Sequence, residues 1–233
     1  MGAVDGPSLS DGAFLLEVLR ALLAGLPLTI GLTAAALLGG GVLALGLAGL
    51  RASSAVGAAV ARAYVFVFRG SPLLIQIFMI YYGLPQFGFI RHSVVWPLLR
   101  EPYVCAALAF MLNDAAYTSE ILRGGLRAVP RGSVEAAVVG NMGRWTLMRR
   151  IVLPLAVRQA LPAYGIEVTS MLKATSLASV VTLMDVTGIA RALVSETYRA
   201  IEVFGVAAVI YLVLVTVTTG GVRALERRWA VGA

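Results

Sequence analysis

Cysteine, histidine and lysine are almost absent from this sequence of 233 residues. Each occurs once, as Cys105, His92 and Lys173. A lone cysteine excludes an intrachain disulfide framework, and with one histidine it leaves no basis for a cysteine- or histidine-based metal cluster. A phosphate-binding Walker A loop needs lysine directly after glycine, whereas Lys173 follows Leu172. We therefore expect no metal site, no bound cofactor and no ATP hydrolysis on this chain.

Charged residues are also scarce. They make up 13% of the chain, against about 25% in a typical soluble domain. Hydrophobic residues make up 59%, and the mean hydropathy is +0.88. A soluble core of this size would need a more polar surface, so the composition predicts an integral membrane protein in contact with membrane lipid.

Five segments are apolar enough to predict an all-α membrane protein with five transmembrane helices. A span needs about 20 mostly apolar residues. Residues 21–50, 70–90 and 203–222 contain no charge at all. Residues 102–122 and 159–184 are interrupted by charged residues, each of which costs about 2.5–3.5 kcal/mol at a helix centre. We expect residues 21–228 to form one transmembrane domain.

The basic residues predict the orientation of these spans. Thirteen of the nineteen lie between spans one and two, between spans three and four, or after span five. Because arginine and lysine concentrate on the cytoplasmic side, these three regions are expected inside. The N-terminus, with residues 1–20, is then outside, and the C-terminus, with residues 229–233, is in the cytoplasm. The net charge of +7 is thus explained by topology, without nucleic-acid binding.

The predicted cytoplasmic loop 123–158 is far longer than the usual 2–8 residues between packed helices. Pro130–Gly132 predicts a turn, and Ser133 is a good N-cap for a short helix that ends at Gly140–Asn141. A second helix is expected from Gly143 through Ile151, before a proline. Two short helices with exposed arginines are typical of a docking element for a soluble partner. The alternative is a hairpin that lies on anionic lipid.

The same loop carries a recognisable motif. Glu135-Ala136-Ala137, followed by Gly140 and by Ile151 to Pro154, resembles the EAA loop of membrane subunits of binding-protein-dependent ABC importers. The glycine position of the family pattern holds Asn141 here, which also tolerates a left-handed backbone. The residues that this resemblance assigns to coupling with an ATPase are Glu135, Ala136, Ala137, Gly140, Asn141, Gly143, Ile151, Leu153 and Pro154.

Other segments resemble the polar amino acid branch of that family, particularly the histidine/lysine/arginine and octopine/nopaline permeases. They are 69–74, 115–124, 160–164, 172–177 and Thr197-Tyr198. One departure is Ile166, where the family often has asparagine before the glutamate of span four. The resemblance implies a non-enzymatic permease subunit of an ATP-driven importer for polar amino acids, with basic amino acids or opines favoured over glutamine or acidic ones.

The resemblance also implies the location and the partners. The chain is expected as a multi-pass protein of the bacterial inner membrane. Its expected partners are an ATP-binding cassette subunit that holds ATP and Mg, a second permease subunit in a homodimer or heterodimer, and a periplasmic solute-binding protein. Two rival classes remain open at this stage. One is a membrane scaffold with a docking loop, and the other is a secondary transporter or channel that works alone.

Charged residues inside the spans are the first candidates for a translocation path. Glu167 and Lys173 are six residues apart, so on a straight helix they point about 120° apart and cannot pair directly. Each must have another partner or face a wet cavity. The candidate path residues are Glu167, Lys173, Thr175 and Ser176. For Glu167 the alternative is a structural ion pair, and Glu120 with Arg123 is expected to form such a pair at the end of span three.

Overall fold

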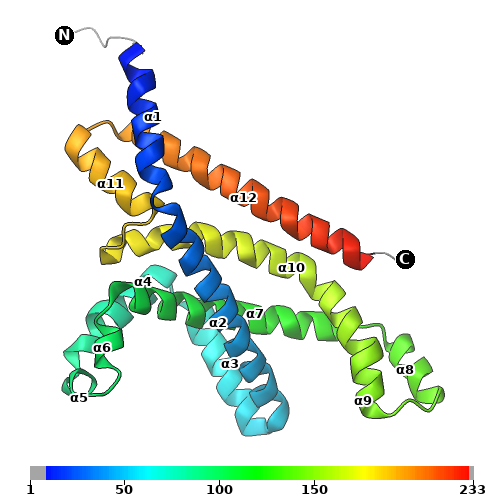
Figure 1. Ribbon diagram of the computed structural model, residues 1–233. Coiled ribbons are helices and arrows are strands. Elements are labelled where there is room, and N and C mark those ends of the chain that lie inside the picture. Colours follow the sequence, from blue (N-terminus) through cyan, green and yellow to red (C-terminus); the bar gives the residue numbers. More distant parts are fainter. Residues whose placement is uncertain (1–8, 231–233) are drawn as a thin grey trace.

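The computed structural model describes residues 9–230, and within this range all regular elements are helices (Figure 1). Parts of the predicted outer segment and of the predicted tail, residues 1–8 and 231–233, lie outside the described residues. The α-helices are α1 (Leu9–Leu23), α2 (Leu26–Ser53), α3 (Ala55–Gly70), α4 (Leu73–Phe78), α5 (Gly88–Arg91), α6 (Trp96–Leu99), α7 (Pro102–Arg127), α8 (Arg131–Val139), α9 (Arg144–Leu147), α10 (Leu153–Ala174), α11 (Val186–Thr197) and α12 (Ala200–Ala230). The described chain also contains two π-helical turns, Met79–Gly83 and Met148–Val152. Its two 3-10 segments are Leu84–Gln86 and Thr175–Val181.

Three helical segments of the described chain are long and apolar enough to cross a membrane. They are Gly12–Ser53, Arg144–Val181 and Ala200–Trp229. A fourth candidate is the pair Ala55–Gly70 and Leu73–Gln86, which is bent by 104°. The 26-residue helix α7 is not among them, and it carries Asp114 and Glu120. The all-helical prediction is confirmed for residues 9–230.

The predicted second span, residues 70–90, does not form one helix. Helix α3 ends at Gly70, and the chain restarts as α4 at Leu73. Pro72 explains the break, because proline disfavours helical geometry in the preceding residue and has no N–H to donate. Ser71 is indeed extended, with φ −104° and ψ 142°. The prediction failed because it began the span at the first charge-free residue, whereas the helix before the break tolerates Arg62 and Arg69.

The long loop contains two short helices, as predicted, but with different ends. Helix α8 begins at Arg131 after Pro130, and Ser133 lies inside it, so the predicted N-cap is wrong. Proline takes the cap position because its missing N–H costs nothing before a helix. The C-terminal end is confirmed, since Gly140 caps the helix and Asn141 has φ 55°.

The predicted stop before Pro154 is also wrong. After α9 the chain continues through the π-turn Met148–Val152 directly into α10. Pro154 is the second residue of α10, in the first turn, where helices accept proline. Helix α9 is therefore joined to α10 by a continuous helical segment rather than by an irregular linker.

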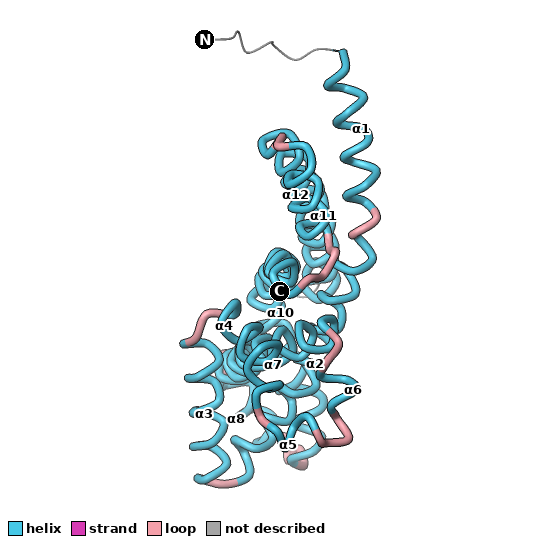
Figure 2. The backbone as a smooth tube through the Cα atoms, turned by 90° about the vertical axis from the view of Figure 1, so that its left-hand side faces the viewer, coloured by secondary structure: helices cyan, strands magenta, loops and turns pink. Residues whose placement is uncertain are grey.

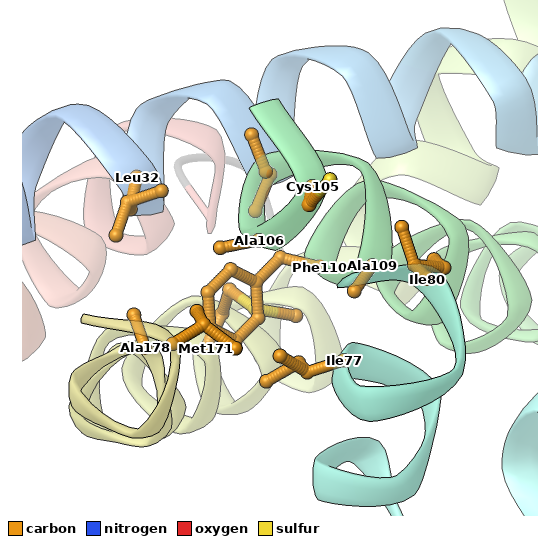
Figure 3. Packing of buried hydrophobic residues seen from close by; sticks show 12 residues of the cluster. Leu32, Ile77, Ile80, Cys105, Ala106, Ala109, Phe110, Met171 and Ala178 are labelled. Carbon is orange, nitrogen blue, oxygen red and sulfur yellow. The ribbon is translucent and has the colours of Figure 1, made fainter. Parts of the chain in front are cut away.

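Helix α7 lies at the centre of the fold and packs against α2, α3, α4 and α10 (Figures 1 and 2). The ring of fully buried Phe110 sits between Leu32 of α2, Ile77 of α4 and Met171 of α10 (Figure 3). Small residues on α7, such as Cys105 and Ala109, are also fully buried, which lets α2 approach closely.

A second buried cluster joins α1 to α11 and α12. Val18 and Leu22 of α1 pack with Val186 of α11 and Val203 of α12. Asp185 caps α11, with its carboxylate accepting hydrogen bonds from the backbone N–H groups of Thr187 at 3.3 Å and Gly188 at 2.9 Å. This cluster fixes the first and last long helices against each other, so the fold closes at this end.

Candidate functional site

A buried carboxylate lies in the middle of α7. Asp114 is fully buried, and one oxygen, Oδ2, accepts a hydrogen bond of 3.2 Å from the Thr118 hydroxyl. The other oxygen, Oδ1, has no hydrogen-bond partner among the described residues. Gly40 of α2 lies directly over this carboxylate, since a Cβ at Gly40 would be 2.3 Å from Oδ2. A buried carboxylate of this kind is costly, so the region around Asp114 is a candidate functional site.

Side-chain amides hold the break between α3 and α4 against α7. The Asn113 amide donates to Gln76 Oε1 at 3.1 Å and to the Phe68 carbonyl at 3.2 Å. The Gln76 amide donates to the Phe68 carbonyl at 2.9 Å and to the Ser71 carbonyl at 3.1 Å. These are carbonyls that the helix break leaves without backbone donors. The bend is thus built into the fold and places Arg69, at the end of α3, beside the centre of α7.

Glu167 of α10 lies close to this bend. Its half-buried carboxylate interacts electrostatically with Asp114 and with the guanidinium of Arg69. Arg69 is exposed and stacks over the Tyr117 ring, 4.9 Å from the ring centre. An adjoining groove of about 380 Å³ is lined by α3, α7 and α10 and includes Arg69, Tyr117, Glu120, Arg123, Gln159 and Ala163. An acid and an exposed guanidinium together match the ammonium and carboxylate of an amino acid zwitterion.

The other predicted path residues lie at the end of α10 and at the start of the 3-10 segment that follows it. Lys173 is exposed, while Thr175 is fully buried and donates its hydroxyl to the Leu172 carbonyl at 2.7 Å. Ser176 donates to the Lys173 carbonyl at 2.8 Å. The structure therefore brings Glu167 to the polar centre but does not bring these three residues there. Both hydroxyls donate to backbone carbonyls at the point where α10 ends and the 3-10 segment begins.

An ion-pair network of three residues lies at one end of the groove. Glu120 accepts from Arg123, with the Nε to Oε2 distance 2.8 Å, which confirms the pair expected from sequence. Its other oxygen accepts from Arg51 Nη1 of α2 at 2.5 Å. Sequence reasoning missed this second arginine because it lies 69 residues away. The pair ties the end of α2 to the end of α7.

The predicted coupling residues lie on the protruding segment from α8 to the start of α10 (Figure 1). Ala137 is 4% exposed, whereas Val138 and Val139 are 60% and 88% exposed. Trp145 on α9 is 76% exposed, and Glu135 is also exposed. Ala137 is therefore covered within this segment, where α8 contacts α9 and the π-turn Met148–Val152, and the neighbouring apolar side chains form an uncovered face beside Glu135.

Comparison with known proteins places this arrangement in a family. Residues 36–231 match the family described as the inner membrane component of binding-protein-dependent transport systems. The chain belongs to this family. The permease is 54% identical over 205 residues to the octopine transport system permease protein OccM of Rhizobium radiobacter, a match that covers 88% of this chain and 84% of the relative. It is 46% identical over 211 residues to the nopaline permease NocM of Agrobacterium fabrum, covering 90% and 88%.

Solved structures agree with this assignment. The permease is similar to a chain from the crystal structure of an amino acid ABC transporter with histidines, with a TM-score of 0.83 and 32% identity over 97% of this chain and 100% of that one. It also has the fold of a chain from the MetNI methionine ABC transporter, with a TM-score of 0.74 at 19% identity, over 91% and 97% of the two chains. In importers of this kind the ATPase is a separate subunit, so the permease is a transport subunit rather than an enzyme.

Proposed function

We propose that this permease forms the translocation path of an ATP-driven importer for basic amino acids or opines. The observation that carries the proposal is the electrostatic interaction of the half-buried Glu167 carboxylate with the exposed guanidinium of Arg69, which stacks over Tyr117 in the wall of the groove. One group suits the cationic part of such a substrate and the other its carboxylate. Relatives at 54% and 46% identity are named for octopine and nopaline, and a solved relative at 32% is an amino acid transporter.

The proposed topology has five spans with the N-terminus outside and the C-terminus in the cytoplasm. The first and fifth spans would lie within the long apolar segments Gly12–Ser53 and Ala200–Trp229, and most of the fourth within Arg144–Val181. The bent pair α3–α4 would be the second, and α7 the third, because it is long enough and is shielded by α2 and α10. Most of residues 21–228 would then form the transmembrane domain in the inner membrane, with residues 1–20 on the periplasmic side.

The proposed coupling element is loop 123–158. Its exposed apolar residues and Glu135 would dock in a cleft of the ATPase subunit, which holds ATP and Mg. The π-turn into α10 would carry the ATPase movement to Glu167. A second permease subunit, identical or related, would complete the path, and a periplasmic solute-binding protein would deliver the substrate.

Replacing Glu167 with glutamine tests the substrate contact. We expect Glu167→Gln to lower the kcat/KM of uptake at least about ten-fold, because a charged hydrogen bond to the substrate is lost. Assembly of the transporter should stay unchanged, since the amide has nearly the same shape. Uptake of labelled arginine and octopine into proteoliposomes gives the measurement. Glu17→Gln, at an exposed residue of α1, is the matched control. Unchanged uptake of every candidate substrate would remove Glu167 from the path.

The substrate class is tested on the partner that delivers it. A thermal-shift screen of the solute-binding protein should show stabilisation by basic amino acids or opines. Stabilisation by glutamine or acidic amino acids alone would overturn the proposed substrate class but not the proposed role as an importer subunit.

Co-purification distinguishes an importer subunit from a membrane scaffold. An ATPase subunit should co-purify with the permease, and deletion of residues 132–143 should abolish that.

A further inference from the structure

A second cleft, of about 310 Å³, lies between α2, α3 and α7. Its basic rim consists of Arg51 from the end of α2 and of Arg123 and Arg127 from the last turns of α7. Its other lining residues are mostly apolar and include Leu47, Val65 and Leu126, which we call its walls. We refer to it as the arginine cleft. It shares Arg123 with the groove beside Arg69, but none of the nine predicted EAA-motif residues and none of the four predicted path residues lines it.

The rim carries more positive charge than the fold itself neutralises. Among residues 9–230, Glu120 is the one carboxylate bonded to Arg51 and Arg123, so within this range one negative charge faces three positive ones. Glu120 engages one nitrogen of Arg51 and two of Arg123, which leaves other guanidinium donors of both residues without this partner. Arg127 is exposed and has no ion-pair partner among residues 9–230. The cleft therefore matches an anionic ligand.

The walls indicate that this ligand has an apolar part. Small residues, Ala48 and Ala52 of α2 and Ala61 of α3, leave room between the helices. The surfaces on either side are strongly apolar, since Leu45 is 64% and Phe66 is 80% exposed. Such surfaces in a membrane protein are covered by acyl chains or by another span. A rim of arginines above apolar walls matches the two halves of a phospholipid.

We propose that the arginine cleft binds an anionic phospholipid, with the headgroup phosphate on Arg51, Arg123 and Arg127 and an acyl chain along Leu47, Val65 and Leu126. A free phosphate would satisfy the rim but leave the walls uncovered. Basic pockets between transmembrane helices on the cytoplasmic side commonly bind such headgroups. Bound there, the lipid bridges the α2–α3 hairpin to α7, next to the Arg51–Glu120 ion pair.

Lipid binding to the purified full-length chain in detergent tests the proposal. Native mass spectrometry with phosphatidylglycerol and phosphatidylcholine gives the two affinities. We expect phosphatidylglycerol to bind preferentially, and Arg127→Gln to weaken it about five-fold, as for one basic residue near a lipid surface. The matched control is Arg62→Gln, at an exposed arginine of α3 outside the cleft, which should leave the affinity unchanged.

A filling variant separates the cleft from the surface charge. Ala52→Phe places a ring at an exposed position in the cleft and keeps all three arginines. Because the ring takes the place of the acyl chain, this variant should lose the preference for phosphatidylglycerol. Glycerol phosphate without acyl chains should not compete. Equal binding of the two lipids, equal loss in Arg62→Gln and Arg127→Gln, or competition by glycerol phosphate would overturn the proposal. None of these readouts depends on the transported substrate.

Discussion

Replacing Glu135 with lysine is expected to abolish the substrate-stimulated ATP hydrolysis of the assembled transporter and to leave membrane insertion intact. Glu135 is exposed on α8, beside the uncovered side chains of Val138 and Val139. Reversing a charge inside a docked surface costs several kcal/mol, because like charges then face each other. We expect stimulation to fall by more than ten-fold. Insertion should not change, because the Glu135 side chain is exposed and Glu135 is not a member of either buried cluster of the described residues.

The control is the same charge reversal elsewhere. Glu17→Lys on α1 changes an exposed glutamate outside the coupling segment and should leave stimulated hydrolysis near its original level. ATPase activity in proteoliposomes, with and without loaded binding protein, gives both values. Normal stimulation in Glu135→Lys would exclude Glu135 from coupling, whereas loss of the permease from the membrane would indicate a folding defect instead.

A valine at Gly40 is expected to disrupt the packing of α2 on α7. Its Cβ would lie 2.3 Å from Asp114 Oδ2 and 2.7 Å from Asp114 Cβ, so the helices must separate. Overpacking of this kind costs about 1–3 kcal/mol, and moving a buried carboxylate adds to it. We expect a fall in Tm of about 5 °C or more in detergent, or loss of monodisperse protein.

The neighbouring glycine provides a matched control. A Cβ at Gly41 would meet nothing within 4 Å. Gly41→Val adds the same side chain to the same helix, so its effect on Tm should be small. Thermal unfolding followed by size-exclusion chromatography compares the two variants. Equal behaviour would show that the close approach of α2 to Asp114 does not limit stability.

The long apolar helices could be predicted from composition, because charge-free segments of 20 residues or more are typical of membrane spans. The predicted spans 21–50 and 203–222 lie within the helical segments Gly12–Ser53 and Ala200–Trp229. The second span could not be placed by charge alone. The arginines of α3 precede the break at Pro72, and their position became clear only from Ser71 and the amides of Asn113 and Gln76.

The candidate site was predictable only in part, because its contacts join distant segments. The charged residues within the predicted spans indicated Glu167 as a candidate. In the structure Glu167 interacts electrostatically with Arg69 and Asp114. Nothing local in the sequence indicates that Gly40 covers Asp114 or that Arg51 reaches Glu120. Ser133 shows the opposite error, since a residue with good capping chemistry was outweighed by the proline three positions earlier.

Transport itself tests the central claim most directly. The permease, its ATPase subunit and its binding protein are reconstituted in proteoliposomes, and uptake of labelled arginine and octopine is measured with ATP, without ATP, and with a hydrolysis-deficient ATPase. We expect uptake of at least one of these substrates only with ATP and the active ATPase. Uptake that continues without ATP, driven by an ion gradient, would contradict it.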